Sequence, residues 1–214
     1  GGYDAAIARV GGAAAFLDRA LVDPALPLAV RIHVPRTLAQ LPPGESVPIL
    51  VRHLGDATLD GTIRFKIIRA LARLRRDHPA LPLDARALRP VIDDNLDRAL
   101  ALAEARGVLR GATRGGAARE LLAELLFDKE LYALDRICSL FALLEPTEDF
   151  VRIFRGVRSP SPRLRSSSRE LLETVIRSPY RDRVLSLVDH VLGEAAKPAR
   201  VADFEPTLRA LAAD

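Results

Sequence analysis

The chain has 214 residues, of which 49% are hydrophobic and 28% are charged, and its formal net charge at pH 7 is +4. This balance favours a folded domain with a sizeable core, and the mild positive charge permits anionic partners without requiring them. The single cysteine excludes an internal disulfide, and no apolar run reaches the about 18 residues of a membrane span. Cys138 lies in the apolar run 137–141, so we expect a buried, unreactive thiol.

Aromatic residues make up only 5% of the chain and tryptophan is absent, so the core must consist mainly of Leu, Ala, Val and Ile. The chain contains no methionine and begins with Gly1-Gly2, so we expect it to be a domain excised from a larger protein or a processed fragment. The use of a single cysteine fits a reducing, cytoplasmic compartment.

The first half of the chain predicts helices separated by turns rich in proline and glycine. Pro35 lies inside the second of these helices and is expected to kink it, because proline lacks an amide proton and clashes with the preceding turn. Asp84 precedes the last of them and is expected to cap it with its carboxylate. The predicted helices cover residues 3–21, 28–41, 45–54, 61–76 and 85–106.

The second half shows the same helical spacing of apolar residues. Ser161 is expected to cap a helix that has Pro162 at its first position, where the missing donor is harmless. The predicted helices cover residues 117–126, 128–144, 146–158, 163–176 and 179–192. One helix over residues 117–144 is the alternative to a break near Phe127. The side chains expected on the inner face of helix 146–158 are Phe150, Val151, Phe154 and Val157. No segment alternates with a period of two, so the predicted fold class is all-α.

The chain also repeats itself, because residues 21–41 align without a gap on residues 54–74 at an offset of 33 residues. The identical pairs are Leu21/Leu54, Asp23/Asp56, Leu26/Leu59, Arg31/Arg64, Arg36/Arg69, Leu38/Leu71, Ala39/Ala72 and Leu41/Leu74. A fixed period of this size indicates an α-solenoid of stacked antiparallel helix pairs. We expect one such domain over residues 1–214, with repeats in 1–110 and 117–192 and a linker with a terminal helix or tail in 193–214.

The repeated charges predict a structural ladder along this stack. Asp23 and Asp56 recur in the turns, Arg31 and Arg64 recur in the following helices, and Arg165 occupies the corresponding place in a weaker third copy. In such a stack, the arginine of one repeat can reach the turn aspartate of its own or the next repeat. The alternative is that these are solvated charges that contribute little stability.

With these residues in view, the chain resembles HEAT-repeat domains, in particular the HEAT region that follows the membrane segment of bacterial proteins related to ATP:ADP exchangers. The resemblance extends over residues 21–192 and rests on 33–39, 63–75, 78–84, 135–144 and 168–175. It implies a cytoplasmic scaffold or regulatory module that a segment outside this chain tethers to the inner membrane. The transport site would lie outside this chain, so the resemblance assigns no functional residue here.

The sequence offers no residues for catalysis, for a cofactor or for a metal ion. The histidines lack the spacing of metal ligands and are scattered at His33, His53, His78 and His190. No nucleophile elbow, phosphate loop or dinucleotide fingerprint occurs. We therefore expect a protein that is not an enzyme and that binds no cofactor or small-molecule substrate.

One stretch combines six arginines with no acidic residue, between positions 152 and 169. The residues predicted to form an anion-binding or partner-binding patch are Arg152, Arg155, Arg158, Arg163 and Arg169, with Arg165 assigned to the ladder. Guanidinium groups bind phosphates and carboxylates, so lipid headgroups, nucleic acid or an acidic protein are the candidate partners. The alternative is an arginine-rich face that is only solvated.

The function that these features favour is a non-enzymatic scaffold that binds a protein partner. A nucleic-acid-binding HEAT protein, comparable to the HEAT-like DNA glycosylases, is less favoured because aromatic residues are few. A lyase-like HEAT protein acting on a bound chromophore lacks the residues that would mark a pocket. Binding to an anionic lipid surface through the arginine-rich stretch is the remaining alternative.

Overall fold

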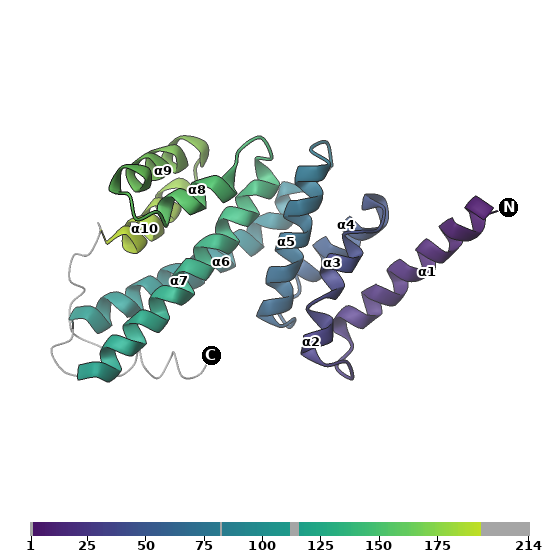
Figure 1. Ribbon diagram of the computed structural model, residues 1–214, viewed down its shortest axis with the longest axis horizontal. Coiled ribbons are helices and arrows are strands. Elements are labelled where there is room, and N and C mark those ends of the chain that lie inside the picture. The colour runs from purple at the N-terminus through teal and green to yellow at the C-terminus, as the bar shows by residue number, and fades with distance from the viewer. Residues whose placement is uncertain (1, 82, 112–115, 194–214) are drawn as a thin grey trace. The chain divides into compact units, whose positions relative to one another are not determined.

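The computed structural model describes residues 2–81, 83–111 and 116–193, with side chains from residue 12 onward, and these residues form helices and turns without a strand. The predicted all-α class is therefore confirmed (Figure 1). The helices are α1 (Gly2–Val22), α2 (Leu28–Arg31), α3 (Val34–Leu38), α4 (Pro43–Leu54), α5 (Gly61–Asp77), α6 (Ala85–Gly111), α7 (Gly116–Leu144), α8 (Phe150–Val157), α9 (Pro162–Val175) and α10 (Arg181–Leu192). Apart from Gly193, the predicted tail 193–214 lies outside the described residues.

The chain divides into two compact units. The first unit comprises residues 1–91 and 139–148, and the second comprises residues 92–138 and 149–214. The long helices α6 and α7 each contribute to both units. The stacking of successive repeats into a solenoid stays a prediction.

The first unit is built around α5, which packs against α3 and α4, while α1 packs against the same two helices. Ile63 and Ile67 of α5 are completely buried. The residues 33 positions earlier differ from each other: Val34 is buried, whereas Val30 is 50% exposed. The two repeats therefore bury the same position in the pair Val34 and Ile67, but not in the pair Val30 and Ile63.

Pro35 accounts for this difference between the two repeats. The sequence predicts Pro35 inside one kinked helix over residues 28–41. The structure corrects this prediction, because α2 ends at Arg31 and a separate helix, α3, starts at Val34 with Pro35 in its first turn. Proline has no amide proton for the carbonyl four residues earlier, but it is tolerated in the first turn of a helix. Two short helices therefore replace the single predicted one.

Helix α7 runs unbroken from Gly116 to Leu144, so the predicted break near Phe127 is wrong and the single long helix is correct. No glycine or proline interrupts the stretch. Leu126 is buried against Ala105 and Leu109 of α6, so the helix carries its apolar contacts through the site of the expected break. Tertiary packing and the absence of a breaker both favour continuity there.

Two predicted helix starts, at Asp84 and at Pro162, are confirmed with one qualification, whereas α8 begins at Phe150 rather than at the predicted residue 146. The carboxylate of Asp84 accepts a hydrogen bond from the amide of Arg86 at 2.8 Å, at the start of α6. Ser161 precedes α9 and Pro162 is its first residue, as predicted, but the Ser161 side chain makes no capping hydrogen bond. The backbone geometry of proline, rather than a hydroxyl cap, defines this helix start.

A buried ion pair joins three helices of the second unit. Glu130 of α7 is completely buried and Arg106 of α6 is 4% exposed. The guanidinium of Arg106 donates to the two carboxylate oxygens of Glu130 at 2.5 and 2.7 Å, and to the backbone carbonyl of His190 in α10 at 2.8 Å. It also lies 5.0 Å from the ring centre of Phe127. Each charge is therefore neutralised and hydrogen-bonded inside the protein, as buried charges require.

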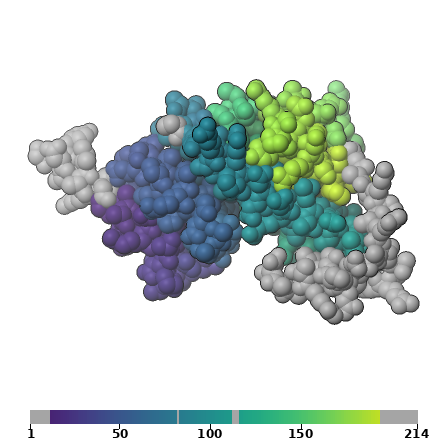
Figure 2. Space-filling model, turned by 180° about the vertical axis from the view of Figure 1, so that it is seen from behind, coloured from purple at the N-terminus to yellow at the C-terminus, as the bar shows by residue number. Residues whose placement is uncertain are grey.

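Helix α10 is held on α6 by a second set of charges. Arg183 of α10 pairs with Asp93 at 2.8 Å and with Asp97 at 2.5 Å, both on α6. Figure 2 shows α10 in yellow-green lying directly against the blue-green stretch of α6. These contacts fix the position of α10, against which α9 packs.

In the first unit, Asp18 of α1 binds two neighbouring side chains of α4. Its carboxylate accepts from Arg52 at 2.5 and 2.6 Å and lies 2.6 Å from Nε2 of His53. Burial alone raises the pKa of the Asp18 carboxyl, but the hydrogen bonds and charges of Arg52 and His53 outweigh it, so the pKa lies below its ordinary value. The ionised form of Asp18 therefore ties α1 to α4.

Glu130→Ala is expected to lower the free energy of unfolding by about 3–5 kcal/mol, because it leaves the charge of Arg106 buried without its partner. Urea denaturation followed by circular dichroism measures this value. Glu124→Ala, on the exposed side of the same helix, is the matched control and should change stability by less than about 0.5 kcal/mol. The double variant Arg106→Met/Glu130→Leu should recover most of the loss. Equal effects of Glu130→Ala and Glu124→Ala would contradict the role of the pair.

Asp18→Asn is expected to lower the thermal midpoint at pH 7, and this difference should shrink and vanish as the pH falls through the depressed pKa of Asp18. A carboxyl with a depressed pKa in the folded state contributes stability that is fully present above its unfolded pKa of about 3.9. This contribution is lost as the pH falls through the folded pKa. Thermal melts of the wild-type protein and the variant, from pH 7 down through the pKa of Asp18, measure the loss of this contribution. Asp77→Asn removes an exposed carboxylate as the control, and a difference that does not change with pH would refute the prediction.

Candidate functional site

Helix α8 has one buried and one exposed face, and the exposed face is basic. The buried side chains are Phe150, Ile153, Phe154 and Val157, which recur at the spacing of a single helix face. The exposed side chains are Val151, Arg152, Arg155 and Arg158. Asp149 caps the helix by accepting from the amide of Arg152 at 3.0 Å. The helix is therefore anchored by its apolar face and presents a row of arginines, one per turn.

This arrangement corrects one residue of the predicted inner face. Val151 is predicted on the inner face, but this side chain is 47% exposed and Ile153 is buried in its place. Positions 150, 153, 154 and 157 follow the i, i+3, i+4, i+7 pattern of one helix face, and position 151 does not. A strict application of the helical period identifies Val151 as an exposed apolar residue among arginines.

Helix α9 approaches α8 closely at Gly156. A Cβ atom built at this position would overlap the Oγ of Ser168, lie 3.1 Å from its Cβ and lie 3.6 Å from the carbonyl oxygen of Leu164. The absence of a side chain at Gly156 thus allows the two helices to touch. Arg152 lies one turn before Gly156 and Leu164 one turn before Ser168, so both flank the line of contact between the helices.

Four of the predicted arginines remain exposed on this pair of helices, and within the described residues none of them forms an ion pair with a carboxylate. Three lie on α8 or at its end, and Arg163 lies in the first turn of α9. The guanidinium of Arg158 also lies 5.6 Å from the ring centre of Phe154. We call these four residues the α8–α9 arginine surface: Arg152, Arg155, Arg158 and Arg163.

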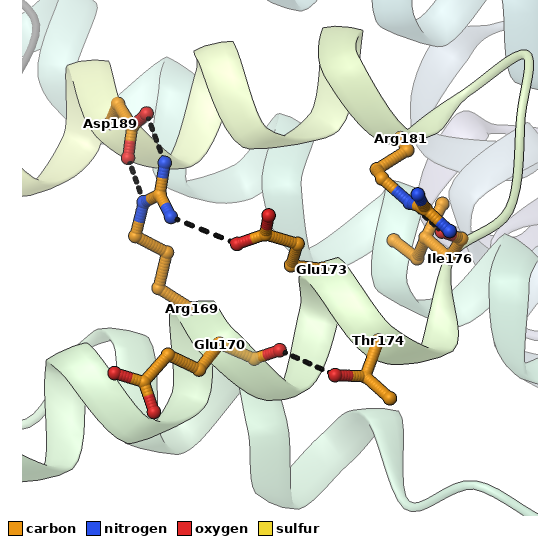
Figure 3. A network of polar contacts seen from close by, with 7 residues as sticks. All are labelled: Arg169, Glu170, Glu173, Thr174, Ile176, Arg181 and Asp189. Atoms are coloured by element: carbon orange, nitrogen blue, oxygen red, sulfur yellow. Dashed lines mark hydrogen bonds and ion pairs between the residues drawn. The ribbon is translucent and has the colours of Figure 1, made fainter.

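Arg169, the fifth residue of the predicted patch, is placed differently. It lies on α9 and binds both carboxylate oxygens of Asp189 on α10, one of them at 2.8 Å (Figure 3). It also lies 3.4 Å from a carboxylate oxygen of Glu173, one turn further along α9. The charge of Arg169 is balanced by these two acids, so this residue joins α9 to α10 and is set apart from the α8–α9 arginine surface.

Arg165, also in this arginine-rich stretch, is hydrogen-bonded within the protein. One terminal nitrogen of Arg165 donates to the backbone carbonyls of Ser159 and Pro160, at 3.0 Å each. These carbonyls belong to the turn between α8 and α9, which Arg165 therefore stabilises. On α10, Arg181 makes a similar contact with the carbonyl of Ile176 at 2.9 Å (Figure 3).

The aspartates of the predicted ladder have equivalent places in the two repeats. Asp23 and Asp56 each accept a hydrogen bond at 2.9 Å from the amide two residues later, in the turn that follows a helix. Hydrogen bonds from the hydroxyl and amide of Thr58 lower the pKa of the Asp56 carboxyl, and the charge of Arg64 has a smaller effect in the same direction. Arg31 lies at the end of α2. The ladder of Asp23, Arg31, Asp56, Arg64 and Arg165 stays a prediction.

In residues 2–81, 83–111 and 116–193, no group of three His, Cys, Asp or Glu side chains could hold a metal ion. No helix of the described part is long and apolar enough to cross a lipid bilayer. Cys138 is buried as predicted, and burial raises the pKa of its thiol to about 12. The described residues thus leave the α8–α9 arginine surface as the candidate functional site.

Gly156→Ala is expected to lower the free energy of unfolding, because the new methyl group overlaps Ser168. In a Ser168→Ala background the same substitution should cost less by about 1 kcal/mol, because the overlapping oxygen is absent. Gly107→Ala is the matched control, since its Cβ would meet open space, and it should stabilise the protein by about 0.5–1 kcal/mol. Urea denaturation of the four proteins and the control provides the values. Additive effects of the Gly156 and Ser168 substitutions would refute the close contact.

Comparison with known proteins gives no further assignment. No protein-family model, curated protein or solved structure matches this chain. The resemblance to HEAT-repeat domains, and the transporter context that it implies, therefore stay predictions. What the chain does is inferred from the geometry and charge of its own surface.

Proposed function

We propose that this chain is a non-enzymatic interaction module, a scaffold or regulatory domain that recognises an anionic partner through the α8–α9 arginine surface. The observation that supports the proposal is the row of exposed arginines for which the described residues provide no carboxylate partner. Such groups retain their full charge and their hydrogen-bond donors for a ligand.

The packing beneath the row supports the same conclusion. Four buried apolar side chains anchor α8, the Gly156 contact holds it against α9, and Arg165 fixes the intervening turn. The backbone positions of the arginines are therefore set before any partner binds. A preorganised surface loses less conformational entropy on binding than a flexible basic segment, so each contact contributes more to affinity.

The triple variant Arg152→Glu/Arg155→Glu/Arg158→Glu tests the proposal with fluorescently labelled inorganic polyphosphate as the anionic probe. Fluorescence anisotropy should show binding to the wild-type chain that weakens as salt rises from about 50 to 300 mM. The triple variant should bind more weakly by about tenfold or more, because losing three exposed ion pairs of about 0.5 kcal/mol each amounts to about 1.5 kcal/mol.

The matched control is Arg36→Glu/Arg89→Glu/Arg110→Glu, which changes three exposed arginines elsewhere and alters the net charge equally. This variant should keep most of the wild-type affinity. Circular dichroism should show the same helix content in all three proteins. Equal losses in both triple variants, or no binding by the wild-type chain, would overturn the proposal.

A further inference from the structure

We infer that the anionic partner of the α8–α9 arginine surface is a phospholipid bilayer with negatively charged headgroups. The inference rests on the proposed function and specifies its ligand. It is carried by the combination, on the same two helices, of exposed apolar side chains with arginines that pair with no carboxylate of the described residues.

Exposed apolar residues lie next to the arginines in both helices. Val151 is 47% exposed and precedes Arg152, while Leu164 is 55% exposed and follows Arg163. Leu171 is 44% exposed and lies two turns beyond Leu164 on the same face of α9. Large apolar side chains on a surface contribute to binding only when a partner removes them from water, which a purely hydrophilic anion would not do.

The location of the helix contact brings the two kinds of side chain together. The carbonyl of Leu164 lies beside Gly156, and Arg152 and Arg155 are within one turn of that glycine. The arginines can therefore meet headgroup phosphates while Val151 and Leu164 reach the boundary between the headgroups and the acyl chains. This division of roles is the one that membrane-surface helices use.

A bilayer also fits the surface better than a nucleic acid does. Proteins that bind single strands stack bases on exposed aromatic rings, and the aromatic rings of α8, at Phe150 and Phe154, are buried. Val151 and Leu164 would find no apolar partner along a phosphate backbone. Lipid headgroups move laterally, so they can adjust to the spacing of the guanidinium groups without a groove of matching shape.

The extent of the surface sets the strength of binding. Glu170 is exposed on the same face of α9 as Arg163, two turns further along, and its negative charge limits the basic area in that direction. Each of the four arginines of the α8–α9 arginine surface would contribute about 1 kcal/mol near an anionic membrane. This corresponds to about fivefold in the membrane partition coefficient per residue. We therefore expect reversible, salt-sensitive binding at the membrane surface.

Vesicle flotation of the full chain tests the inference. Vesicles of phosphatidylcholine with about 30% phosphatidylglycerol should bind the wild-type chain at about 50 mM salt, and vesicles of phosphatidylcholine alone should not. The Arg152→Glu/Arg155→Glu/Arg158→Glu variant should lose about 100-fold or more in partition, while Arg36→Glu/Arg89→Glu/Arg110→Glu should retain most of it.

The variant Val151→Ser/Leu164→Ser separates a bilayer from other anions. It should partition several-fold less onto the anionic vesicles but bind polyphosphate as tightly as the wild-type chain, because only the bilayer offers an apolar layer. Both side chains are exposed, so the substitutions leave the core intact. Leu121→Ser/Leu125→Ser, which changes exposed leucines on α7, is the matched control and should leave vesicle binding unchanged.

The outcomes distinguish the inference from the function on which it rests. Binding to polyphosphate through the arginines without binding to anionic vesicles would overturn the lipid inference and leave the proposed function standing. Unchanged vesicle binding by Val151→Ser/Leu164→Ser would also overturn the inference. Tighter binding to a labelled DNA oligonucleotide than to the vesicles, at the same salt concentration, would replace the bilayer with nucleic acid as the partner.

Discussion

The arrangement of the second unit depends on the buried ion pair between Arg106 and Glu130. Removing two charges from water costs several kcal/mol for each ion, and the pair is tolerated because both carboxylate oxygens and the His190 carbonyl receive hydrogen bonds from the same guanidinium. The geometry that satisfies these groups specifies how α6, α7 and α10 lie together. Asp189 precedes His190 on α10, so the same contact also positions the acid that binds Arg169.

This chain of contacts decides which arginines are available at the surface. Asp189 and Glu173 form ion pairs with Arg169, and the carbonyls of the turn between α8 and α9 accept hydrogen bonds from Arg165. Arg152, Arg155 and the rest of the α8–α9 arginine surface keep theirs. The protein thus uses part of one arginine-rich stretch to hold its helices together and leaves the other part exposed on a rigid support.

Local rules predicted the features that depend on neighbouring residues, namely the all-α class, the capping by Asp84, the position of Pro162 and the burial of Cys138. They also located the arginine-rich stretch. They could not predict that Asp189 would meet Arg169, because 20 residues and a turn separate the two and only tertiary packing brings them together. The predicted break in α7 failed for a similar reason, since contacts with α6 stabilise the helix across Phe127. Val151 is a different case, because the helical period alone was sufficient to place it.

The burial of Cys138 has a practical consequence for studying this surface. Its thiol is the only one in the chain, and with a pKa of about 12 it stays protonated and enclosed at neutral pH. A cysteine introduced at an exposed position, for example by Val151→Cys, would therefore be the single site open to alkylation. The native sequence thus accepts one spectroscopic label at a chosen point without first having its own sulfur removed.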